Sequence, residues 1–527
     1  MKSQNIVLKV IDYCQNHSNQ LAMIINKKPF FGKSHYLRIS YGKLYDDILF
    51  SAHQLKQNGF KKGDRILVFV PMSYELYVIA LSILYIGAVL VFVDAWANKN
   101  RLAMACDIVQ PVGFIGTLKA QLLRLSQSIR NIPIKIISNS LISSQIVPKN
   151  DGITSEAEYV GNENEAIVTF TTGSTGAPKA AKRTHGFLLS QRNALMEHMP
   201  LQKDEVNLVT LPIFVMNNLS MGIPSYLPDF NPAKPSDFDA DSMITQINEL
   251  NIASSIASPA FFENIANTIL KTNQLTSFKT IYTGGAPVFK PLAIKLRKAF
   301  PKTDVHVVYG ATEVEPVSSI PLDDYINLDH SAGLPLGKIV NGLQLKIIQP
   351  TSEPVQIKDN ESLKDYEISN NEVGEIIVSG DHVLKEYIGS SLEFNKNKIV
   401  SENQLWHRTG DAGRIDVKGF VYLHGRIKNR FYTNQNKCLF SIPIEQDLLK
   451  IDGVLFSAIF ETNEKIYIAL EVDPSISSSK KTHIISQVNE RIKEIQVHKI
   501  LFLNNIPRDP RHNSKADYEK IRLMIKK

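Results

Sequence analysis

The residues most able to do chemistry stand together in one short segment. A strand-like run, AIVTF (166–170), is followed at once by TTGSTGAPK (171–179). Glycines let the backbone turn and bring its N–H groups close to an anion. Hydroxyl groups donate hydrogen bonds without fixed charge, and lysine adds a compact positive charge. The pattern predicts a phosphate-binding segment made from Thr171, Thr172, Gly173, Ser174, Thr175, Gly176 and Lys179.

This segment differs from the Walker phosphate loop. That loop reads G-x-x-x-x-G-K-[ST], whereas here Lys179 follows Gly176 at another spacing. Glycine, serine and threonine are also common in ordinary turns. A polar turn after a buried strand is therefore the alternative that the residue types leave open.

Short apolar runs alternate with stretches of helical length up to about residue 425, and these elements must position the segment. Examples are ILVFVP (66–71), VGFIG (112–116), IKIIS (134–138), VNLVT (206–210) and VHVVYG (305–310). The alternation predicts layered α/β structure with largely parallel sheets. After about residue 340, LQLKIIQP and EIIVSG are closer together and predict a β-rich subdomain.

A smaller module begins near Gly425. It contains VLFSAIF, KIYIALEV, a helical stretch at residues 481–495, HKILFLNNIP and a C-terminal helical pattern. These features are typical of a small α+β unit. We therefore expect a large domain at residues 1–425 and a small, mobile domain at residues 426–527. The short polar linker Arg426–Lys428 is suited to act as a hinge.

Composition narrows the class of protein. The chain has 527 residues, 43% hydrophobic and 21% charged, which is ordinary for a globular protein. The net charge of +7 comes without a dense Lys/Arg block, so no nucleic-acid partner is expected. The three cysteines show neither a disulfide framework nor zinc-ligand spacing. They favour a reducing, cytoplasmic location.

Neither apolar stretch of the N-terminal region predicts a membrane span. The first stretch, within residues 1–20, is short and interrupted by Lys9 and Asp12, which makes it a poor signal peptide. The stretch Tyr77–Val93 is near the lower length limit for a spanning helix, but Gly87 divides it. We expect a buried strand–helix–strand unit there and no integral membrane segment. Peripheral membrane contact stays open.

Segment 171–179 resembles the signature loop of the adenylate-forming superfamily, which contains acyl-CoA synthetases, luciferases and peptide-synthetase adenylation domains. That loop usually reads [YF]-T-S-G-[ST]-T-G-x-P-K-G. Here Ser174 and Thr175 fill the hydroxyl positions, and Ala180 replaces the last glycine. Other segments follow in the family's order along nearly the whole chain. The resemblance implies an enzyme that activates a carboxylic acid with ATP, with segment 171–179 as the triphosphate clamp.

Two further segments resemble parts that hold the acyl group and the adenine. LPIFVMNNL (211–219) is similar to the aromatic-containing loop that borders the acyl site, with Val215 where the family often has His. YTGGAPV (282–288) is similar to the strand and turn that receive adenine. The resemblance implies adenine contacts from Gly284, Gly285, Ala286 and Pro287, and acyl-pocket walls from Phe214, Asn217, Ser258 and Pro259.

The pentad YGATE (309–313) matches a specific family motif. The resemblance implies that Tyr309, followed by Gly310, offers an aromatic face to the adenine and that Thr312 donates to the α-phosphate. Glu313 would bind Mg²⁺, which takes oxygen ligands. Taken alone, a strand followed by a polar turn would explain the same letters.

Two more segments resemble the ribose site and the hinge. HRTGD (407–411) places Asp411 where the family accepts hydrogen bonds from the ribose hydroxyls, and a carboxylate is a good double acceptor for a diol. In GFVYLHGRIK (419–428), Arg426 would touch the ribose or the phosphates. Lys428 falls on the family's hinge position.

IPRDPRHNSKADYEK (506–520) resembles the family pattern P-R-x-x-x-G-K. Lys515 matches the lysine that reaches into the active site, with Ser514 in place of glycine, although the spacing from Pro510 is one residue short. A lysine in a basic tail is otherwise most often exposed. Because Lys515 lies in the small domain, the implied catalysis requires domain closure.

The segment after Lys428 bears on which acceptor takes the activated acid. After Lys428, the loop before Pro443 and Glu445 is longer than in CoA ligases and has no glycine. That loop helps to form the thiol tunnel in CoA ligases, so CoA use is in doubt. Segments 93–122, 309–320 and 510–515 resemble the olefin β-lactone synthetase branch instead.

The branch resemblance implies adenylation of a long β-hydroxy acid, followed by attack of the acid's own hydroxyl group. Such an intramolecular step needs no second substrate. A fatty acyl-CoA synthetase is the main alternative. A non-catalytic nucleotide-binding homologue is the other.

Overall fold

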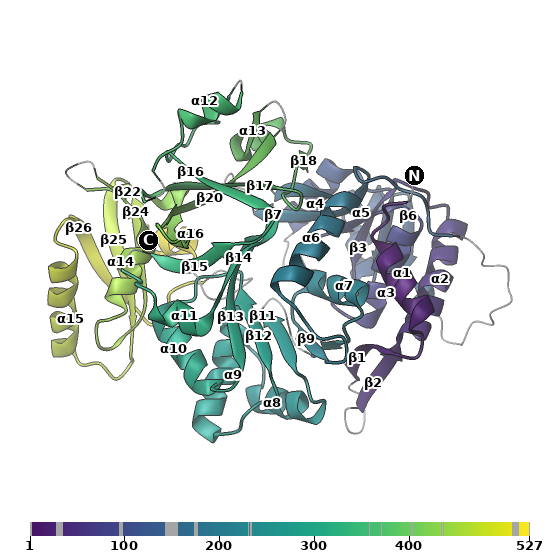
Figure 1. The fold of residues 1–527 in the computed structure, drawn as a ribbon, viewed down its shortest axis with the longest axis horizontal. Helices are drawn as coiled ribbons and strands as arrows, with labels where there is room; N and C mark the ends of the chain where they lie inside the picture. Colours follow the sequence, from purple (N-terminus) through teal and green to yellow (C-terminus); the bar gives the residue numbers. More distant parts are fainter. Residues whose placement is uncertain are drawn as a thin grey trace.

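Two large β-sheets with covering helices form most of the molecule, and a small α+β unit follows them (Figure 1). This computed structural model describes residues 3–27, 35–93, 99–142, 156–172, 178–229, 231, 234, 236–331, 333–357, 359–369, 371–401, 404–433, 435, 437–508 and 516–525.

The smaller of the two main sheets contains the strands on both sides of segment 171–179. Its seven strands run in the order β18–β8–β7–β4–β3–β5–β6. Their bounds are β3 Arg65–Phe69, β4 Val89–Phe92, β5 Gly113–Gly116, β6 Ile134–Ile137, β7 Glu165–Thr172, β8 Pro178–Thr184 and β18 Glu386–Ile388. Strands β7, β4, β3, β5 and β6 are parallel, and β8 returns antiparallel to β7. The strands predicted within residues 66–71, 112–116, 134–138 and 166–170 are confirmed.

The apolar stretch Tyr77–Val93 lies in a helix and a strand, as predicted. Helix α3 (Tyr74–Tyr85) begins where Ser73 Oγ accepts a hydrogen bond from the N–H of Leu76 (3.3 Å). Gly87, with φ of +69°, then turns the chain toward β4. Within the residues described above, no helix is both long enough and apolar enough to cross a membrane.

The larger sheet joins a parallel half to an antiparallel half. Its order is β16–β17–β20–β21–β15–β14–β13–β12–β11–β9–β10–β1–β2, with β19 beside β20. Their bounds are β1 Leu21–Lys27, β2 His35–Ser40, β9 Asn207–Val209, β10 Ser225–Leu227, β11 Ser254–Ala257, β12 Thr280–Gly284, β13 Asp304–Ala311, β14 Val314–Pro321, β15 Leu334–Ile339, β16 Leu343–Ile348, β17 Gly374–Gly380, β19 Lys398–Ser401, β20 Gln404–Ile415 and β21 Val421–Arg426. Strands from β1 to β13 in this sheet are parallel except β2. The antiparallel half confirms the β-rich region predicted after residue 340.

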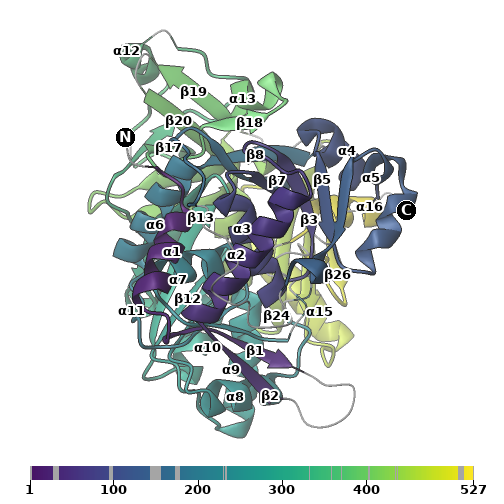
Figure 2. The same ribbon diagram turned by 90° about the vertical axis from the view of Figure 1, so that its right-hand side faces the viewer.

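Helices cover these sheets, and α8, α9 and α10 lie together beside the parallel half (Figures 1 and 2). They pack through apolar residues at three- and four-residue spacing, such as Met243, Ile244 and Ile247 of α8. The other elements are α1 Val7–Asn16, α2 Tyr41–Gln57, α4 Lys99–Val109, η1 Ala120–Leu125, α5 Gln127–Arg130, η2 Ser138–Leu141, α6 His185–His198, α7 Pro212–Met221, α8 Ala240–Glu249, α9 Pro259–Thr272, α10 Lys290–Ala299, α11 Leu322–Asn327, α12 Asn360–Lys364 and α13 Ser391–Asn397.

The chain after Arg426 builds separate sheets. Strands β24, β25 and β26 form one sheet, and β22 and β23 form a hairpin. The elements are η3 Ile427–Asn429, β22 Phe431–Tyr432, β23 Cys438–Leu439, α14 Ser441–Leu448, β24 Val454–Thr462, β25 Lys465–Val472, α15 Ser478–Arg491, β26 Val497–Leu503 and α16 Tyr518–Ile525. The predicted fold class, a large α/β domain with a β-rich subdomain followed by a small α+β domain, is confirmed. The boundary between residues 425 and 426 stays a prediction.

Candidate active site

Several predicted site segments follow neighbouring parallel strands of the larger sheet. Strands β9, β11, β12 and β13 lie side by side and run in the same direction, so their carboxyl ends meet at one edge. In open α/β sheets this edge is where ligands bind. Phe214 follows β9, Ser258 follows β11, Gly284 ends β12 and Tyr309 lies near the end of β13. The structure therefore brings the residues predicted to contact the acyl group and the adenine to one edge of the sheet.

The turn after β12 requires glycine at two positions, for different reasons. A Cβ on Gly284 would lie 2.3 Å from the carbonyl oxygen of Val308 on the adjacent strand. Gly285 has φ of +81°, a conformation that favours glycine. The turn continues through Ala286 and Pro287, and the absence of side chains at the two glycines leaves its main chain open to close approach by a ligand.

Thr312 and Glu313 form the two-residue loop of the β13–β14 hairpin. Arg183 Nη2 donates to the Thr312 carbonyl oxygen (3.0 Å), and the Leu384 N–H donates to the Glu313 carbonyl oxygen (2.7 Å). A Cβ on Gly310 would lie 3.2 Å from the main chain of β14. The main chain of the loop is thus fixed from both sides.

Tyr309, Asp411 and Arg426 form a hydrogen-bonded cluster. Tyr309 Oη donates to Asp411 Oδ2 (2.7 Å), while Arg426 Nη1 donates to Asp411 Oδ1 (2.7 Å). Burial, and then the Asp411 charge, raise the pKa of Tyr309 well above its ordinary value, and Asp411 raises the pKa of Arg426. Tyr309 therefore stays a donor and Arg426 stays charged. Each Asp411 oxygen keeps a further lone pair for a diol.

A buried ion pair supports the stretch of β20 that carries Asp411. Arg408 Nε donates to Glu375 Oε2 (3.0 Å), and Glu375 Oε1 accepts from the N–H of Gly410 (3.3 Å). Burial raises the pKa of Glu375, and Arg408 opposes this shift. The N–H of Asp411 donates to Thr409 Oγ1 (3.0 Å). These contacts fix the main chain around Asp411, and its two donors fix the side chain.

Lys179 is held by a carboxylate. It lies at the start of β8, opposite the end of β7. Its Nζ is 2.6 Å from Glu393 Oε2 and donates to Asn397 Oδ1 (3.2 Å). Asn397 Nδ2 donates to the same Glu393 oxygen (3.2 Å). Glu393 and Asn397 lie on α13, so this helix packs beside Lys179 at the end of the predicted clamp.

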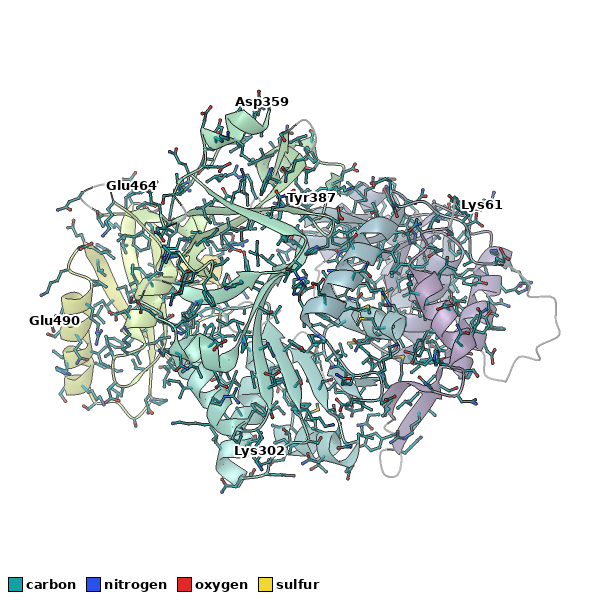
Figure 3. The ribbon with its side chains drawn as sticks, viewed as in Figure 1. Lys61, Lys302, Asp359, Tyr387, Glu464 and Glu490 are labelled. Carbon is teal, nitrogen blue, oxygen red and sulfur yellow. The ribbon has the colours of Figure 1, made fainter. Side chains whose placement is uncertain are left out.

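Tyr387, labelled in Figure 3, links this cluster to Glu313; it lies in β18, the edge strand of the seven-stranded sheet, beside β8. Its hydroxyl group donates to Glu313 Oε1 (3.2 Å). Lys179 and Lys398 each lie over its ring, with Nζ 5.8 and 5.7 Å from the ring centre. Lys398 is buried and donates to the Leu384 carbonyl oxygen. Burial lowers the pKa of Lys398 to about 7, although Glu313 opposes the shift.

Sequence analysis missed Tyr387, Glu393 and Lys398. No motif quoted above contains them, and their only local signal is the Ser390 N-cap of α13, whose Oγ accepts from the N–H of Glu393 (3.1 Å). They reach the site through tertiary packing between α13, β18, β19 and the β7–β8 hairpin.

Glu313 fits a magnesium site that uses a single carboxylate. In the part of the chain that the structure describes, no three or more His, Cys, Asp or Glu side chains group as a metal site. Mg²⁺ commonly takes one or two carboxylates together with substrate phosphates and water. The oxygen chemistry of Glu313 beside a triphosphate meets that requirement.

Segment 211–219 is a helix, and the expectation of a loop is wrong. Helix α7 begins at Pro212, in the first helical position, and ends at Gly222 with φ of +78°. Proline at the start and glycine just past the end are favoured helix boundaries. Phe214 and Asn217 are buried on this helix.

Two polar atoms of the predicted acyl pocket are buried without a hydrogen-bond partner among the described residues. They are Asn217 Nδ2 and Ser258 Oγ. Ser258 precedes α9, which begins at Pro259. An unpaired buried polar group costs free energy. These two atoms therefore suit a ligand that carries a polar group alongside its apolar chain.

Other predicted parts lie outside the described residues or at the edge of them. The structure describes no side chain for Thr171 or Thr172 and nothing of residues 173–177, which include Gly173, Ser174, Thr175 and Gly176. Residues 509–515, with Lys515, are likewise outside the described part. Lys428 is exposed in η3, between the last strand of the larger sheet and β22. Its hinge role stays a prediction.

Comparison with known proteins supplies a family and relatives. Residues 12–388 match a family model described as AMP-binding enzyme. An olefin beta-lactone synthetase of Xanthomonas campestris pv. campestris is 24% identical over 503 residues, which cover 89% of this chain and 87% of that protein. A second one, from Stenotrophomonas maltophilia, is 24% identical over 488 residues and 88% of this chain and 87% of that protein. A 4-coumarate–CoA ligase-like protein of Arabidopsis thaliana is 22% identical, covering 90% of this chain and 83% of that protein.

Solved structures share the fold. The ATP-bound structure of MatB from Rhodopseudomonas palustris superposes with a TM-score of 0.80 at 18% identity, covering 100% of this chain and 99% of that chain. The O-succinylbenzoate coenzyme A synthetase of Bacillus subtilis in complex with AMP gives a TM-score of 0.75 at 17% identity, covering 96% of each chain. Both likenesses extend over the large and the small domain.

Proposed function

Because the chain belongs to the AMP-binding enzyme family and is an adenylate-forming ligase, we propose that it activates a long-chain or β-hydroxy fatty acid and closes the activated β-hydroxy acid to a β-lactone. The observation that supports a β-lactone product is the similarity, over most of both chains, to two proteins named olefin beta-lactone synthetase. ATP is the proposed second substrate and Mg²⁺ the proposed cofactor. A cytoplasmic location belongs to the same proposal, since all three cysteines are free thiols.

In the first step, an oxygen of the acid attacks the α-phosphorus of ATP, and the bond to the β-phosphate oxygen breaks to release pyrophosphate. Both reactants are anionic, so the site must offset charge and hold them in line. Lys179 supplies charge for the outer phosphates, Lys515 for the α-phosphate, and Thr312 a hydroxyl donor. Bound at Glu313, Mg²⁺ would offset phosphate charge.

The nucleoside half of ATP takes the other end of the site. Tyr309 and the glycine turn after β12 would enclose the adenine, while Asp411 accepts from the ribose hydroxyls. Arg426 orients the Asp411 carboxylate through the 2.7 Å hydrogen bond between them. No protein nucleophile is needed, because the acyl-adenylate is itself the activated species.

In the second step, the β-hydroxyl oxygen of the acid attacks its own carbonyl carbon. The carbonyl–phosphate bond breaks, AMP leaves and the hydroxyl proton is lost, which closes a four-membered ring. The reacting groups are in one molecule, so positioning replaces a second binding site. The unpaired Asn217 Nδ2 and Ser258 Oγ suit the orientation of such a hydroxyl group.

Thioester formation with CoA is the second candidate function. The similarity to a CoA ligase-like protein favours it. Against it stands the segment after Lys428, where β22 and β23 form a hairpin in the region that forms the thiol tunnel of CoA ligases.

The test supplies ATP, Mg²⁺ and a β-hydroxy fatty acid, with and without CoA, and uses the unsubstituted acid of equal length as a matched substrate. We expect AMP, pyrophosphate and a β-lactone from the hydroxy acid without CoA. The unsubstituted acid should support pyrophosphate exchange but give no lactone. Strictly CoA-dependent turnover to a thioester would contradict the lactone proposal. Bound nucleotide without any exchange would favour the non-catalytic homologue.

A further inference from the structure

The segment that contains η1 exposes three leucines. Leu118, Leu122 and Leu125 are 72%, 70% and 76% exposed, and we call them the leucine patch. Single exposed apolar side chains are common on soluble proteins. Three on one short segment, at spacings of four and three residues, form a local apolar surface of the kind that marks an interaction site.

The leucine patch stands on a well-anchored segment. Ala120 is buried and Leu123 packs against the same core as the seven-stranded sheet. Gln121 Nε2 donates to the carbonyl oxygens of Gly116 and Ile136 (both 2.9 Å), which ties η1 to β5 and β6. The inward residues are thus fixed while the leucines stay exposed, so the patch is preformed.

The stretch of chain that contains the leucine patch has charges of one sign. Residues 108–142 contain Lys119, Arg124, Arg130 and Lys135 and no Asp or Glu, which gives this stretch a net charge of +4. Lys119 and Arg130 are exposed. Leucines interleaved with Lys and Arg are the composition that binds anionic lipid surfaces, through apolar insertion and attraction to headgroups.

The leucine patch lies at the same edge of the sheet as the carboxyl end of β7 and the start of β8, the described residues on either side of the predicted phosphate segment. Strands β7, β4, β3 and β5 are parallel and adjacent in that order. Segment 171–179 begins at the carboxyl end of β7, and the patch begins just beyond the carboxyl end of β5. At about 4.8 Å per strand, the two strand ends are roughly 14 Å apart along the edge. Figure 2 shows α5, which follows η1, at the periphery of the molecule.

We propose that the leucine patch, together with the exposed Lys119 and Arg130 of the same segment, docks this enzyme reversibly on an anionic bilayer surface. Docking would bring the edge that carries the phosphate segment close to a membrane. If the substrate is a long-chain acid, which rests on the proposed function, the membrane is also where that acid partitions. The docking itself depends on neither the acid nor the acceptor.

The test measures co-sedimentation of the full chain with vesicles of phosphatidylcholine mixed with phosphatidylglycerol, and with pure phosphatidylcholine vesicles. The variant is Leu118→Ser/Leu122→Ser/Leu125→Ser. The matched control, Leu270→Ser/Leu275→Ser/Val417→Ser, removes three exposed apolar side chains elsewhere. We expect the wild type and the control to bind the anionic vesicles, less at high salt. The patch variant should bind at least tenfold more weakly.

Activity toward a short, water-soluble acid should be equal in all three proteins, which shows that each is folded. Three results would overturn the proposal. The first is binding to anionic vesicles that the patch variant retains, and the second is no wild-type binding to these vesicles. The third is a dimer in solution that only the patch variant dissociates, because the patch would then be an interface between two copies of the chain.

Discussion

The two ends of the candidate nucleotide site each contain a cation–carboxylate pair, but they use it in opposite ways. At the ribose end, the carboxylate of Asp411 is the group we propose for the ligand, and Arg426 and Tyr309 orient it. At the phosphate end, the cation of Lys179 is the group we propose for the ligand, and its Nζ is paired with Glu393 Oε2 at 2.6 Å.

This difference separates a preformed subsite from one that must rearrange. Asp411 keeps lone pairs for a diol while both of its donors stay in place. To bind phosphate, Lys179 must exchange a carboxylate oxygen for a phosphate oxygen. Part of the binding free energy is therefore offset by the loss of its ion pair with Glu393. AMP should therefore bind without rearrangement at the ribose end, whereas ATP and pyrophosphate should compete with Glu393.

The largest expected effect comes from a cation that belongs to neither end. Lys515→Ala should lower acid-dependent ATP–pyrophosphate exchange by about 1,000-fold, the range found when a group that stabilises transition-state charge is removed. Release of product from a supplied acyl-adenylate should change little. Normal exchange in this variant would show that Lys515 is not the catalytic lysine.

The ribose end is tested by Asp411→Asn. The amide keeps the shape but loses the charge that Arg426 needs and one acceptor for the diol. The affinity for both AMP and ATP, measured by calorimetry, should fall about 100-fold, as expected for two charged hydrogen bonds. Asp416→Asn is the control, because Asp416 accepts only from main-chain N–H groups and a tyrosine within its own hairpin among the described residues. Equal losses in both variants would indicate a general folding defect.

The phosphate end is tested by Lys179→Met, which keeps the length of the side chain and removes the charge. ATP and pyrophosphate should bind about 30-fold more weakly, because charge-assisted hydrogen bonds to the phosphates are lost. AMP, which lacks the outer phosphates, should bind as in the wild type. A matching loss of AMP affinity would mean that the two ends are not independent.

The smallest effect has the opposite sign. Glu393→Gln should release Lys179 and tighten ATP and pyrophosphate binding about tenfold, equivalent to about 1.4 kcal/mol, without changing AMP affinity. Glu386→Gln is the matched control, since Glu386 pairs with Lys182 at 2.7 Å on the neighbouring strands β18 and β8. Weaker ATP binding in Glu393→Gln would show that Glu393 supports the phosphate site.

Local sequence patterns predicted much of the fold. A run of β-branched residues predicted the strand at 66–71, because a central parallel strand needs apolar side chains on both faces. The strand at 134–138 has the same residue types, although β6 is an edge strand and only partly buried. Gly87 marked where α3 ends and β4 follows. The loop expected at 211–219 was wrong, although Pro212 and Gly222 were boundary signals for a helix.

The site was only partly predictable. Tyr309, Asp411 and Arg426 stood in motifs, and the structure places them in one cluster. The pair between Lys179 and Glu393 joins residues more than two hundred positions apart along the chain, so no local pattern marks it. Lys398 and Tyr387 join Glu313 in the same way, through the packing of β18 and β19.

Acid-dependent ATP–pyrophosphate exchange by the wild-type protein tests the central claim most directly. With Mg²⁺ present and CoA absent, we predict that a β-hydroxy fatty acid starts the exchange, and that omitting the acid stops it. Tight binding of AMP or ATP without exchange for any acid would contradict the claim that this chain activates a carboxylic acid.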